Sequence, residues 1–373
     1  HLRSNDSLST QIENFSNTTT LLNEIWAHQH NSVAKQLKEN NPAWDDEQLY
    51  QEARRIVIAQ IQHITIHEYL PLLIGKKTMI FYNISNTPDE FTNYYNPLVR
   101  PDTINVFAAV IGEFYRTMWA TATISNSPLE RSDYVQSLFV EPASHPSLKD
   151  LRKDAFQSGP SVDIDPAALL IQRGRDHGIP SYVKWRKFCR GEQLFFPISS
   201  FDQLNDIVID PHNLIPALKK VYRSVEDVDL IVLALAEKLL HGSLVGPTLG
   251  CILALQYQKV IHGDSYWYSN NMADFSFTLP QLRAITSTTF AKVICRYLGA
   301  GAHVQPNAFL VPDNFDNYPV NCNSSTHNDM SLDEWKSLPI EFPITDRNIR
   351  ILLEKAKENV EKKKKAKTRF PRS

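Results

Sequence analysis

The chain has little glycine and no long apolar run, and both shortages limit what it can be. Glycine makes up only 12 of 373 residues, about 3% where ~7% is usual. This argues against collagen-like sequence, glycine-rich repeats and turn-rich β architecture. No apolar run approaches the roughly 18 residues of a membrane-spanning helix. The formal net charge of −2 argues against nucleic-acid binding through a diffuse basic field.

Motifs typical of several other classes are also missing. No CxxC pair occurs, so a zinc ribbon or a thioredoxin-like motif is not supported. His63 and His67 share a helix face, but no HExxH arrangement or obvious third ligand accompanies them. Two surface or core histidines are therefore favoured over a metal site, and we expect no metal. No stretch alternates apolar and polar residues with the period of two that is typical of a β-strand. No linker rich in Gly, Ser or Pro divides the chain.

Helical periodicity dominates instead. Apolar spacing predicts a first helix that Asn40-Asn41-Pro42 ends, and a second that Asp45 and Gln48 begin as in a capping box. The second helix ends near Pro71. Further helices are expected over 106–118, from Asp165-Pro166, and over 228–240, 247–262 and 280–298. We expect a mainly α fold with long loops around 125–160, 191–215 and 300–345.

Positive charge gathers at the carboxyl end. Residues 354–373 contain nine Lys or Arg and three Glu, a net charge of +6 against −8 for the rest. The run Lys362–Lys365 indicates either a solvated tail or a patch for a heparin-like anionic polysaccharide. We therefore expect a helical domain over 1–345, followed by a terminal helix and basic tail over 346–373.

Cysteines and glycosylation sequons favour a secreted protein with two disulfides. Three sequons within the first 19 residues indicate an exposed, glycosylated amino end. The chain begins at His1 without a signal peptide, so a mature product, a processed chain or a fragment is expected. The residues concerned are Cys189, Cys251, Cys295 and Cys322, and Asn5, Asn14, Asn17, Asn83 and Asn323.

Two arginines, an aspartate and a histidine lie within five residues, around Gly174. This signature cluster consists of Arg173, Arg175, Asp176 and His177. At a helix end, such residues predict a tight knot of hydrogen bonds and ion pairs. From the residues alone, a structural and a catalytic role both remain open.

The segment around this cluster, QRGRDHGIP at 172–180, resembles the signature of the animal haem peroxidase family. Similarity extends from His28 to about Trp335 and includes NPAWDDE at 41–47, LYQEARRIV at 49–57, EYLPLLIG at 68–75, LVGPT at 244–248 and VIC at 293–295. The resemblance implies a mostly helical, extracellular domain that lacks the family's amino-terminal part. It also implies disulfides Cys189–Cys251 and Cys295–Cys322.

The family holds haem through a proximal histidine, but this chain differs at the matching positions. The register is fixed by Asn105, Phe107, Ala108, Phe114 and Thr117. It places Arg116 at the histidine position, and arginine has no lone pair to offer iron. Glu113 replaces an arginine that pairs with a haem propionate. No histidine occurs between His67 and His145, so a shifted register does not restore the ligand.

Other haem-site positions differ too. The family's distal histidine and calcium-binding loop lie upstream of the region matching His1, so the calcium site is expected to be absent. Arg3 corresponds to the distal arginine and Asp6 to a glutamate that esterifies haem. Paired asparagines, one of which supports the proximal histidine, correspond to Glu226 and Asp227.

These departures predict an extracellular, catalytically degenerate family member without bound haem, acting through binding or adhesion to an unidentified partner. The alternative is an active peroxidase that oxidises small donors with hydrogen peroxide. It would need an unconventional iron ligand and a missing upstream segment, with Arg3 polarising the peroxide bond and Asp6 contacting haem. A truncated product without an independent role is a third possibility.

Overall fold

The computed structural model describes residues 17–84, 90–92, 94–117, 138, 142, 165–190, 197–272 and 275–336. The chain divides into two compact units, His1–Glu334 and Trp335–Ser373. The elements that carry the sites below belong to the first unit. The expected boundary at 345 and the basic tail lie outside the described residues.

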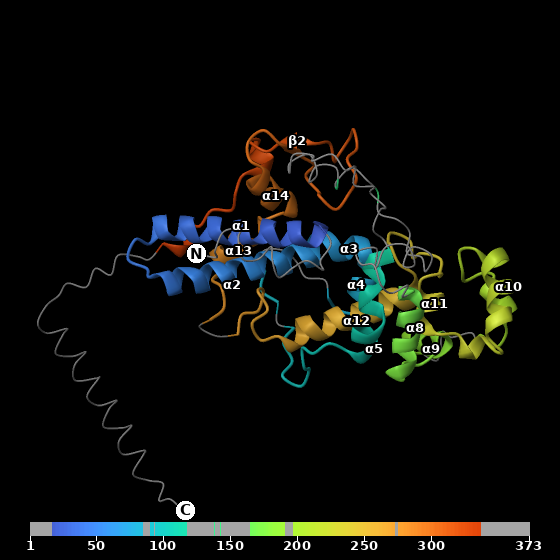
Figure 1. Cartoon of the computed structure of the whole chain (residues 1–373). Coiled ribbons are helices and arrows are strands. Elements are labelled where there is room, and N and C mark those ends of the chain that lie inside the picture. Colours follow the sequence, from blue (N-terminus) through green and yellow to red (C-terminus); the bar gives the residue numbers. More distant parts are fainter. Residues whose placement is uncertain are drawn as a thin grey trace, which may run out of the picture. The chain divides into compact units, whose positions relative to one another are not determined.

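The described residues are mainly helical, as expected (Figure 1). The α-helices are α1 (Asn17–Asn40), α2 (Asp46–Ile64), α3 (Leu70–Leu73), α4 (Lys76–Phe81), α5 (Asn105–Ala109), α8 (Pro166–Asp176), α9 (Tyr182–Arg190), α10 (Pro211–Val221), α11 (Leu230–Ala234), α12 (Pro247–Gly263), α13 (Leu279–Thr286) and α14 (Phe290–Leu298). A π-helix, η1 (Thr65–Tyr69), joins α2 to α3, and a 3-10 helix, η2 (Ile111–Thr117), follows α5. The short strands β1 (His303–Val304) and β2 (Val320–Asn321) pair antiparallel.

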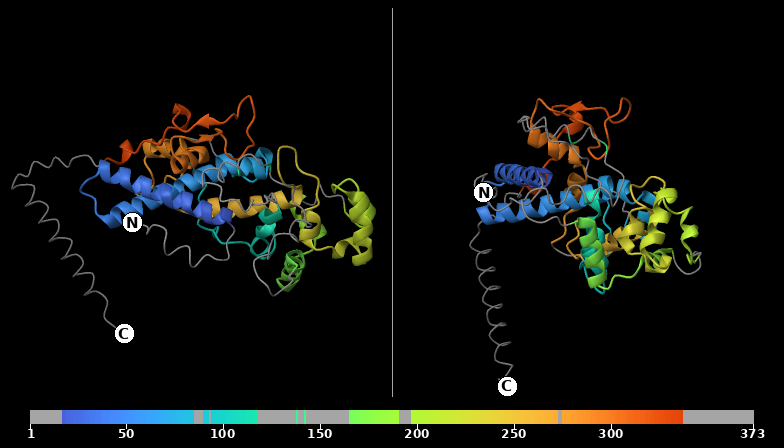
Figure 2. Two further views of the ribbon diagram at one scale, coloured as in Figure 1. Left: turned by 45° about the horizontal axis from the view of Figure 1, so that its top comes forward. Right: turned by 45° about the vertical axis from the view of Figure 1, so that its right-hand side comes forward.

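The two longest helices, α1 and α2, lie side by side (Figures 1 and 2). The Asp45 side chain caps α2 by accepting a hydrogen bond from the backbone N–H of Gln48 at 2.8 Å. The helical path continues through η1 and α3 to Leu73, so it passes Pro71, which takes an early position in α3. Because proline is tolerated in a first turn, it does not end this path.

The core beside these helices includes α14. Ile25 of α1, Ile64 of α2 and Ile294 of α14 belong to one buried cluster. Trp26 and Phe290 add a stacked pair with ring centroids 5.9 Å apart. Buried apolar contacts of this kind are the main stabilising term in such a fold.

Some expected elements were wrong in extent. The segment 228–240 is α-helical only over α11, and 280–298 forms two helices, α13 and α14. Thr289 separates these two, because its side chain accepts a hydrogen bond from the Lys292 N–H at 3.3 Å and so begins a new helix. Helix α10 lies partly within the expected loop 191–215.

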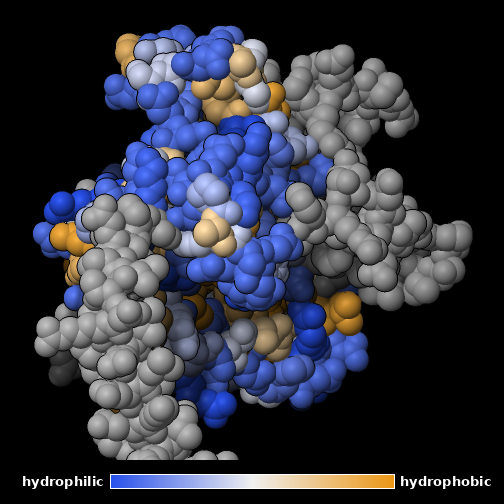
Figure 3. Space-filling model, turned by 90° about the vertical axis from the view of Figure 1, so that its left-hand side faces the viewer, coloured by the Kyte–Doolittle hydropathy of each residue, from blue (hydrophilic) through white to orange (hydrophobic). Residues whose placement is uncertain are grey.

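None of the described helices is both long and apolar enough to cross a membrane. On the face shown in Figure 3, hydrophilic residues predominate among those described, and hydrophobic residues form small separate groups.

Candidate functional site

The helix expected over 106–118 is broken at Val110. Helix α5 ends at Ala109, Val110 adopts φ −135° and ψ −62°, and the chain continues as the 3-10 helix η2. A Cβ atom at Gly112 would lie 2.9 Å from the carbonyl oxygen of Phe107. The backbone therefore needs a glycine directly after the break. The expectation of one long helix here was wrong.

The signature cluster lies at the carboxyl end of α8. Asp165 caps this helix by accepting from the Ala167 N–H at 2.9 Å, and Pro166 takes its first position, as predicted. Gly178 follows the helix with φ 63°, a left-handed conformation that favours glycine. The signature therefore marks a helix end and the turn after it.

Arg173 connects α8 to both sides of the break at Val110. Its Nε atom donates to the carbonyl of Ala109, at the end of α5, where backbone acceptors lack helical partners. Its Nη2 atom lies 3.7 Å from Glu113 Oε1. A Cβ atom at Gly174 would lie 3.1 Å from Val110 Cγ2, so α8 packs directly on the break.

Arg175 holds a carboxylate from a different element. Its Nε and Nη2 atoms donate to the two carboxylate oxygens of Asp229 at 3.0 and 2.6 Å. The hydroxyl of Tyr222 also donates to Asp229, at 2.7 Å. The hydrogen bonds and the charge pairing of Arg175 with Asp229 raise the pKa of Arg175, and burial raises the pKa of Tyr222 to about 12. The pair links α8 to the start of α11.

The other two side chains of the signature cluster are exposed. His177 Nδ1 lies 2.9 Å from Asn105 Oδ1, and Asn105 Nδ2 donates to the His177 carbonyl at 3.2 Å. Asp176 is exposed and pairs with none of the described residues. Asp176 was expected in the knot, but among the described residues Arg175 takes its carboxylate partner from Asp229. Glu226 and Asp227 are also exposed, in a 3-10 turn before α11.

A buried ion pair near this cluster escaped sequence reasoning. Glu237 is fully buried and accepts from Arg186 Nη1, from the Tyr182 hydroxyl at 2.7 Å, and from the Thr248 N–H and hydroxyl at 2.7 Å each. Arg186 and Tyr182 lie on α9, and Thr248 lies on α12. The available signal was the carboxylate of Glu237 in the middle of the apolar run 228–240, where a charge needs a buried partner.

Both disulfides implied by the resemblance are present. Cys189–Cys251 joins α9 to α12, with Cα atoms 5.9 Å apart, and Cys295–Cys322 joins α14 to the residue after β2, with Cα atoms 5.2 Å apart. The first disulfide therefore connects two helices, and the second connects α14 to the segment after β2.

Several predicted positions lie outside the described structure. Arg3, Asp6, Asn5 and Asn14 belong to residues that are not described. The backbone of Arg116 lies in η2 and that of Asn17 begins α1, but neither side chain is described. Among the sequons, Asn83 and Asn323 are exposed.

The histidines singled out by their spacing do lie together. The rings of His63 and His67 are 4.4 Å apart between centroids, and both face the Tyr268 hydroxyl, at 3.2 and 3.4 Å. The described part of the chain holds no group of three or more His, Cys, Asp or Glu residues suited to a metal ion. Through their hydrogen bonds to Tyr268, the two histidines form part of a polar cluster.

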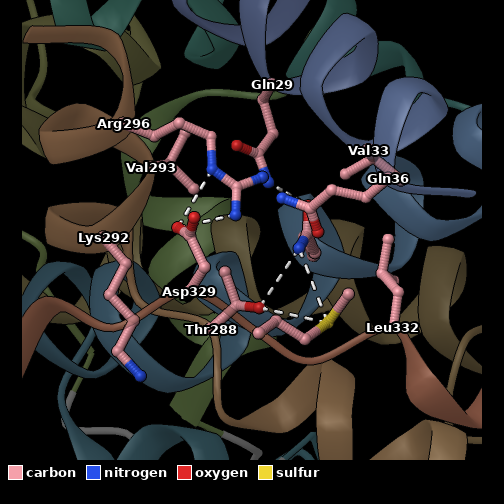
Figure 4. A pocket seen from close by; sticks show the side chains of 11 residues that line it. Gln29, Val33, Gln36, Thr288, Lys292, Val293, Arg296, Asp329 and Leu332 are labelled. Atoms are coloured by element: carbon pink, nitrogen blue, oxygen red, sulfur yellow. Dashed lines mark hydrogen bonds and ion pairs between the residues drawn. The ribbon is translucent and has the colours of Figure 1, made fainter. Parts of the chain in front are cut away.

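A small polar cavity lies among α1, α2, α14 and residues 329–332 (Figure 4). Gln29 Nε2 donates to Gln60 Oε1 at 3.0 Å, and Gln60 Nε2 donates to Thr288 Oγ1 at 3.2 Å. Arg296 pairs with Asp329 at the edge, at 2.6 Å. The free space is only about 10 Å³, room for one water molecule at most. This arrangement pairs the Nε2 groups of Gln29 and Gln60, but Gln29 Oε1 has no partner among the described residues. It leaves no space for a larger ligand.

The residues around α5 and η2 do not fit haem held in the way that the resemblance implies. Glu113 places a carboxylate where a propionate partner is expected, and its contact is Arg173. Arg116 cannot donate a lone pair to iron. His177 bonds to α5 at its first residue, Asn105. Iron ligation at the expected position therefore has no suitable donor among these groups.

Comparison with known proteins gives the same family as the signature. A family model described as animal haem peroxidase matches residues 9–135 and 114–309. The chain is 31% identical over 344 residues to peroxidasin homolog pxn-2 of Caenorhabditis elegans, covering 84% of this chain and 25% of that protein. It is 31% identical over 327 residues to a peroxidase-like protein of Margaritifera margaritifera, covering 78% and 41% respectively.

A solved structure is similar as well. Peroxidase A from Dictyostelium discoideum superposes with a TM-score of 0.59 and 27% identity, covering 76% of this chain and 55% of that chain. The chain thus spans between a quarter and about half of the length of these relatives.

Proposed function

Because the chain belongs to the animal haem peroxidase family, we propose that it is an extracellular, catalytically degenerate member that acts as a binding or adhesion scaffold. The contact between Glu113 and Arg173 carries this proposal. At this position a haem-binding relative is expected to offer a cation to a propionate. Here a carboxylate offers like charge, which disfavours the propionate.

The rest of the signature cluster supports the same reading. Arg173 binds a backbone carbonyl and Glu113, and Arg175 binds Asp229. Each of these contacts stabilises the packing of α8 against its neighbours. None requires a cofactor, so the scaffold can persist without haem.

The disulfides and the glycosylation sequons support an extracellular location. Disulfides form and persist in oxidising compartments, and this chain has two, with no free cysteine. Two sequons, at Asn83 and Asn323, are exposed and therefore accessible for glycosylation. Mass spectrometry of the protein secreted from animal cells tests this, and unmodified asparagines together with free thiols would contradict it.

The visible absorption spectrum of the purified protein tests the proposal that the chain does not bind haem. After incubation with hemin and gel filtration, we expect no Soret band of stoichiometric intensity and guaiacol oxidation no faster than with hemin alone. A matched control is the Glu113→Gln variant, which removes the like charge. A stoichiometric band with the unmodified chain would overturn the degenerate assignment.

The second candidate is an active peroxidase that uses hydrogen peroxide. The names of relatives such as Peroxidase A favour it. Turnover of guaiacol by the unmodified chain, well above the hemin background, would establish this candidate and reject the first.

An anionic polysaccharide is the partner proposed for the basic segment. Residues 354–373 carry a net charge of +6, and such segments bind polyanions in a salt-dependent manner. The full chain should bind immobilised heparin and elute with salt, while a chain ending at residue 353 should not. Equal retention of both would contradict this part.

A further inference from the structure

A large cavity lies between α2 and the segment that follows α12. Its volume is about 570 Å³, within the usual range of small-ligand sites. One side is formed by α2 residues that share a helix face, such as Arg55, Ala59 and Gln62. The opposite side is formed by the loops around Trp267 and Phe277. The cavity thus has rigid helical residues on one wall and aromatic residues on the other.

Aromatic rings supply the apolar surface of this cavity. Trp267 and Phe277 are buried in its wall, whereas Tyr266 and Phe275 are 72% and 42% exposed at its edge. The latter two rings lie with centroids 4.6 Å apart at 36°. The two rings are tilted against each other, and each keeps an exposed apolar surface that the fold itself does not bury. Such surface commonly marks a contact for a ligand.

Arg55 holds the aromatic wall of the cavity in place. Its guanidinium lies 3.9 Å above the centre of the Phe277 ring and donates to the Phe275 carbonyl at 2.6 Å. It also pairs with Glu52 at 2.9 Å. Arg55 therefore attaches the aromatic loop to α2, and its charge is compensated by Glu52. The cavity is held in shape before any ligand arrives.

The remaining polar groups comprise both donors and acceptors. Gln62 Oε1 accepts from the Tyr268 N–H at 3.0 Å, and its Nε2 atom has no partner among the described residues. Asp264 Oδ1 accepts from the Tyr266 N–H at 2.8 Å, and its Oδ2 atom likewise has none. Within the described structure, the Arg54 guanidinium also lacks an ion-pair partner. A ligand can thus find donors at Gln62 and Arg54 and an acceptor at Asp264.

This combination selects the chemistry of the ligand. An anion would use only the donors and would meet repulsion from Asp264, and a cation would use only the acceptor. A hydroxyl group both donates and accepts, so a polyhydroxylated ligand uses all three groups. The charges of the described lining residues also balance, because Arg54 and Arg55 are matched in number by Glu52 and Asp264. A neutral ligand is therefore favoured.

We propose that this cavity binds a neutral saccharide, with a sugar ring stacked on Tyr266 and Phe275 and its hydroxyl groups bonded to Gln62, Asp264 and Arg54. A pyranose ring has an apolar face of C–H groups, which fits the negative face of an aromatic ring. The site deepens the proposed binding role, and it involves α2 and residues 264–268 and 275–277. It holds whether or not the chain binds haem.

The test uses the full secreted chain after enzymatic removal of its own glycans. Chitotriose, cellotriose, maltotriose and mannotriose are added up to about 10 mM, and binding is followed by saturation-transfer NMR and tryptophan fluorescence. We expect at least one trisaccharide to bind, and Tyr266→Ala to weaken its binding at least tenfold. Tyr266→Phe keeps the ring and should retain binding. Tyr318→Ala removes another exposed tyrosine and serves as the control.

Two results would overturn the proposal. One is absence of binding by every trisaccharide in the set. The other is tight binding of benzoate that Arg54→Gln abolishes, because this would make the cavity an anion site. Hemin binding is measured by the Soret band, whereas saccharide binding is measured by NMR and tryptophan fluorescence. Failure here and failure of the degenerate assignment are therefore distinguishable.

Discussion

Arg186 and Glu237 form an ion pair inside the protein, with 7% and 0% of their side-chain surface exposed. Removal of one partner from such a pair leaves an uncompensated buried charge, at a cost of about 3–5 kcal/mol. Arg186→Ala should therefore lower the free energy of unfolding by about this amount. Urea unfolding followed by circular dichroism measures it.

The control for that variant is an exposed ion pair in the same chain. Lys219 lies 2.8 Å from Asp202, and the two side chains are 48% and 75% exposed. Lys219→Ala should cost less than about 1 kcal/mol. Equal losses in the free energy of unfolding for Arg186→Ala and Lys219→Ala would show that burial does not determine how much each ion pair stabilises the protein.

Asp229, and not Asp176, is the carboxylate on which the signature cluster depends. Asp229 accepts from Arg175 and Tyr222, whereas Asp176 is exposed. Asp229→Ala should destabilise the fold by about 1–3 kcal/mol, and Asp176→Ala by no more than about 0.5 kcal/mol. Differential scanning calorimetry compares the two. A larger effect at Asp176 would contradict the assignment.

Restoring the expected haem residues should not restore an enzyme. Glu113→Arg combined with Arg116→His supplies a ligand, but the new arginine would face Arg173, which lies 3.7 Å from the present carboxylate. Weak hemin binding is expected, with guaiacol oxidation near the rate of free hemin. Stopped-flow and steady-state assays check this, and rapid turnover would show that these two positions were the principal defect.

The stability of the protein should fall as pH rises from about 4.5 to about 7 because of Glu68. Its carboxylate accepts from the Phe290 N–H at 3.0 and 3.3 Å at the start of α14. Burial raises its pKa from 4.5 to about 7, although this hydrogen bond and Lys292 act in the opposite direction. The folded state therefore holds a proton that the unfolded state releases. The resulting stability is fully present below the unfolded pKa and is lost as pH rises through the folded one.

Glu68→Gln keeps an acceptor for Phe290 and removes the titration. Urea unfolding of both proteins from about pH 5 to about pH 8 should show the parent losing up to about 3 kcal/mol relative to this variant. A difference that stays constant with pH would contradict the role of Glu68.

The cysteine pairs should differ in their effect on stability. Cys189–Cys251 closes a separation of 62 residues and Cys295–Cys322 one of 27. In the chain-entropy account the first contributes about 4 kcal/mol and the second about 3.5 kcal/mol. Serine replacement of each pair, followed by thermal unfolding, measures both contributions. Non-reducing peptide mapping that found other pairings would contradict the assignment.

Local signals predicted where helices begin, and distant partners decided where they end. Asp45 and Asp165 cap α2 and α8 as their spacing indicated, because a cap involves neighbours in sequence. The run 228–240 looked like one buried helix. The α-helix in this run ends at Ala234. Glu237, later in the run, pairs with Arg186 of α9 and accepts a hydrogen bond from Thr248 of α12. No spacing within the run reveals those partners.

The sequence also could not reveal the distant partners of the residues in the candidate site. The sequence identified Arg173 and Arg175 as members of a hydrogen-bonded cluster, and the structure supplies their partners Ala109 and Asp229. Asp229 lies 54 residues from Arg175 along the chain, so the neighbouring Asp176 was the more obvious candidate. The cavity beside α2 was not foreseen, since its walls come from segments more than 200 residues apart, as the contact between Arg55 and Phe275 shows.

The contacts of Arg173 and Arg175 also bear on how genomes are searched for enzymes. Each arginine holds one helix to another, through a backbone carbonyl or through Asp229. Selection for folding alone would preserve such residues after chemistry had been lost. If this chain has lost its activity, as we propose, a search that relies on this motif will collect inactive descendants together with working enzymes. Separating them requires inspection of the positions equivalent to Glu113 and Arg116.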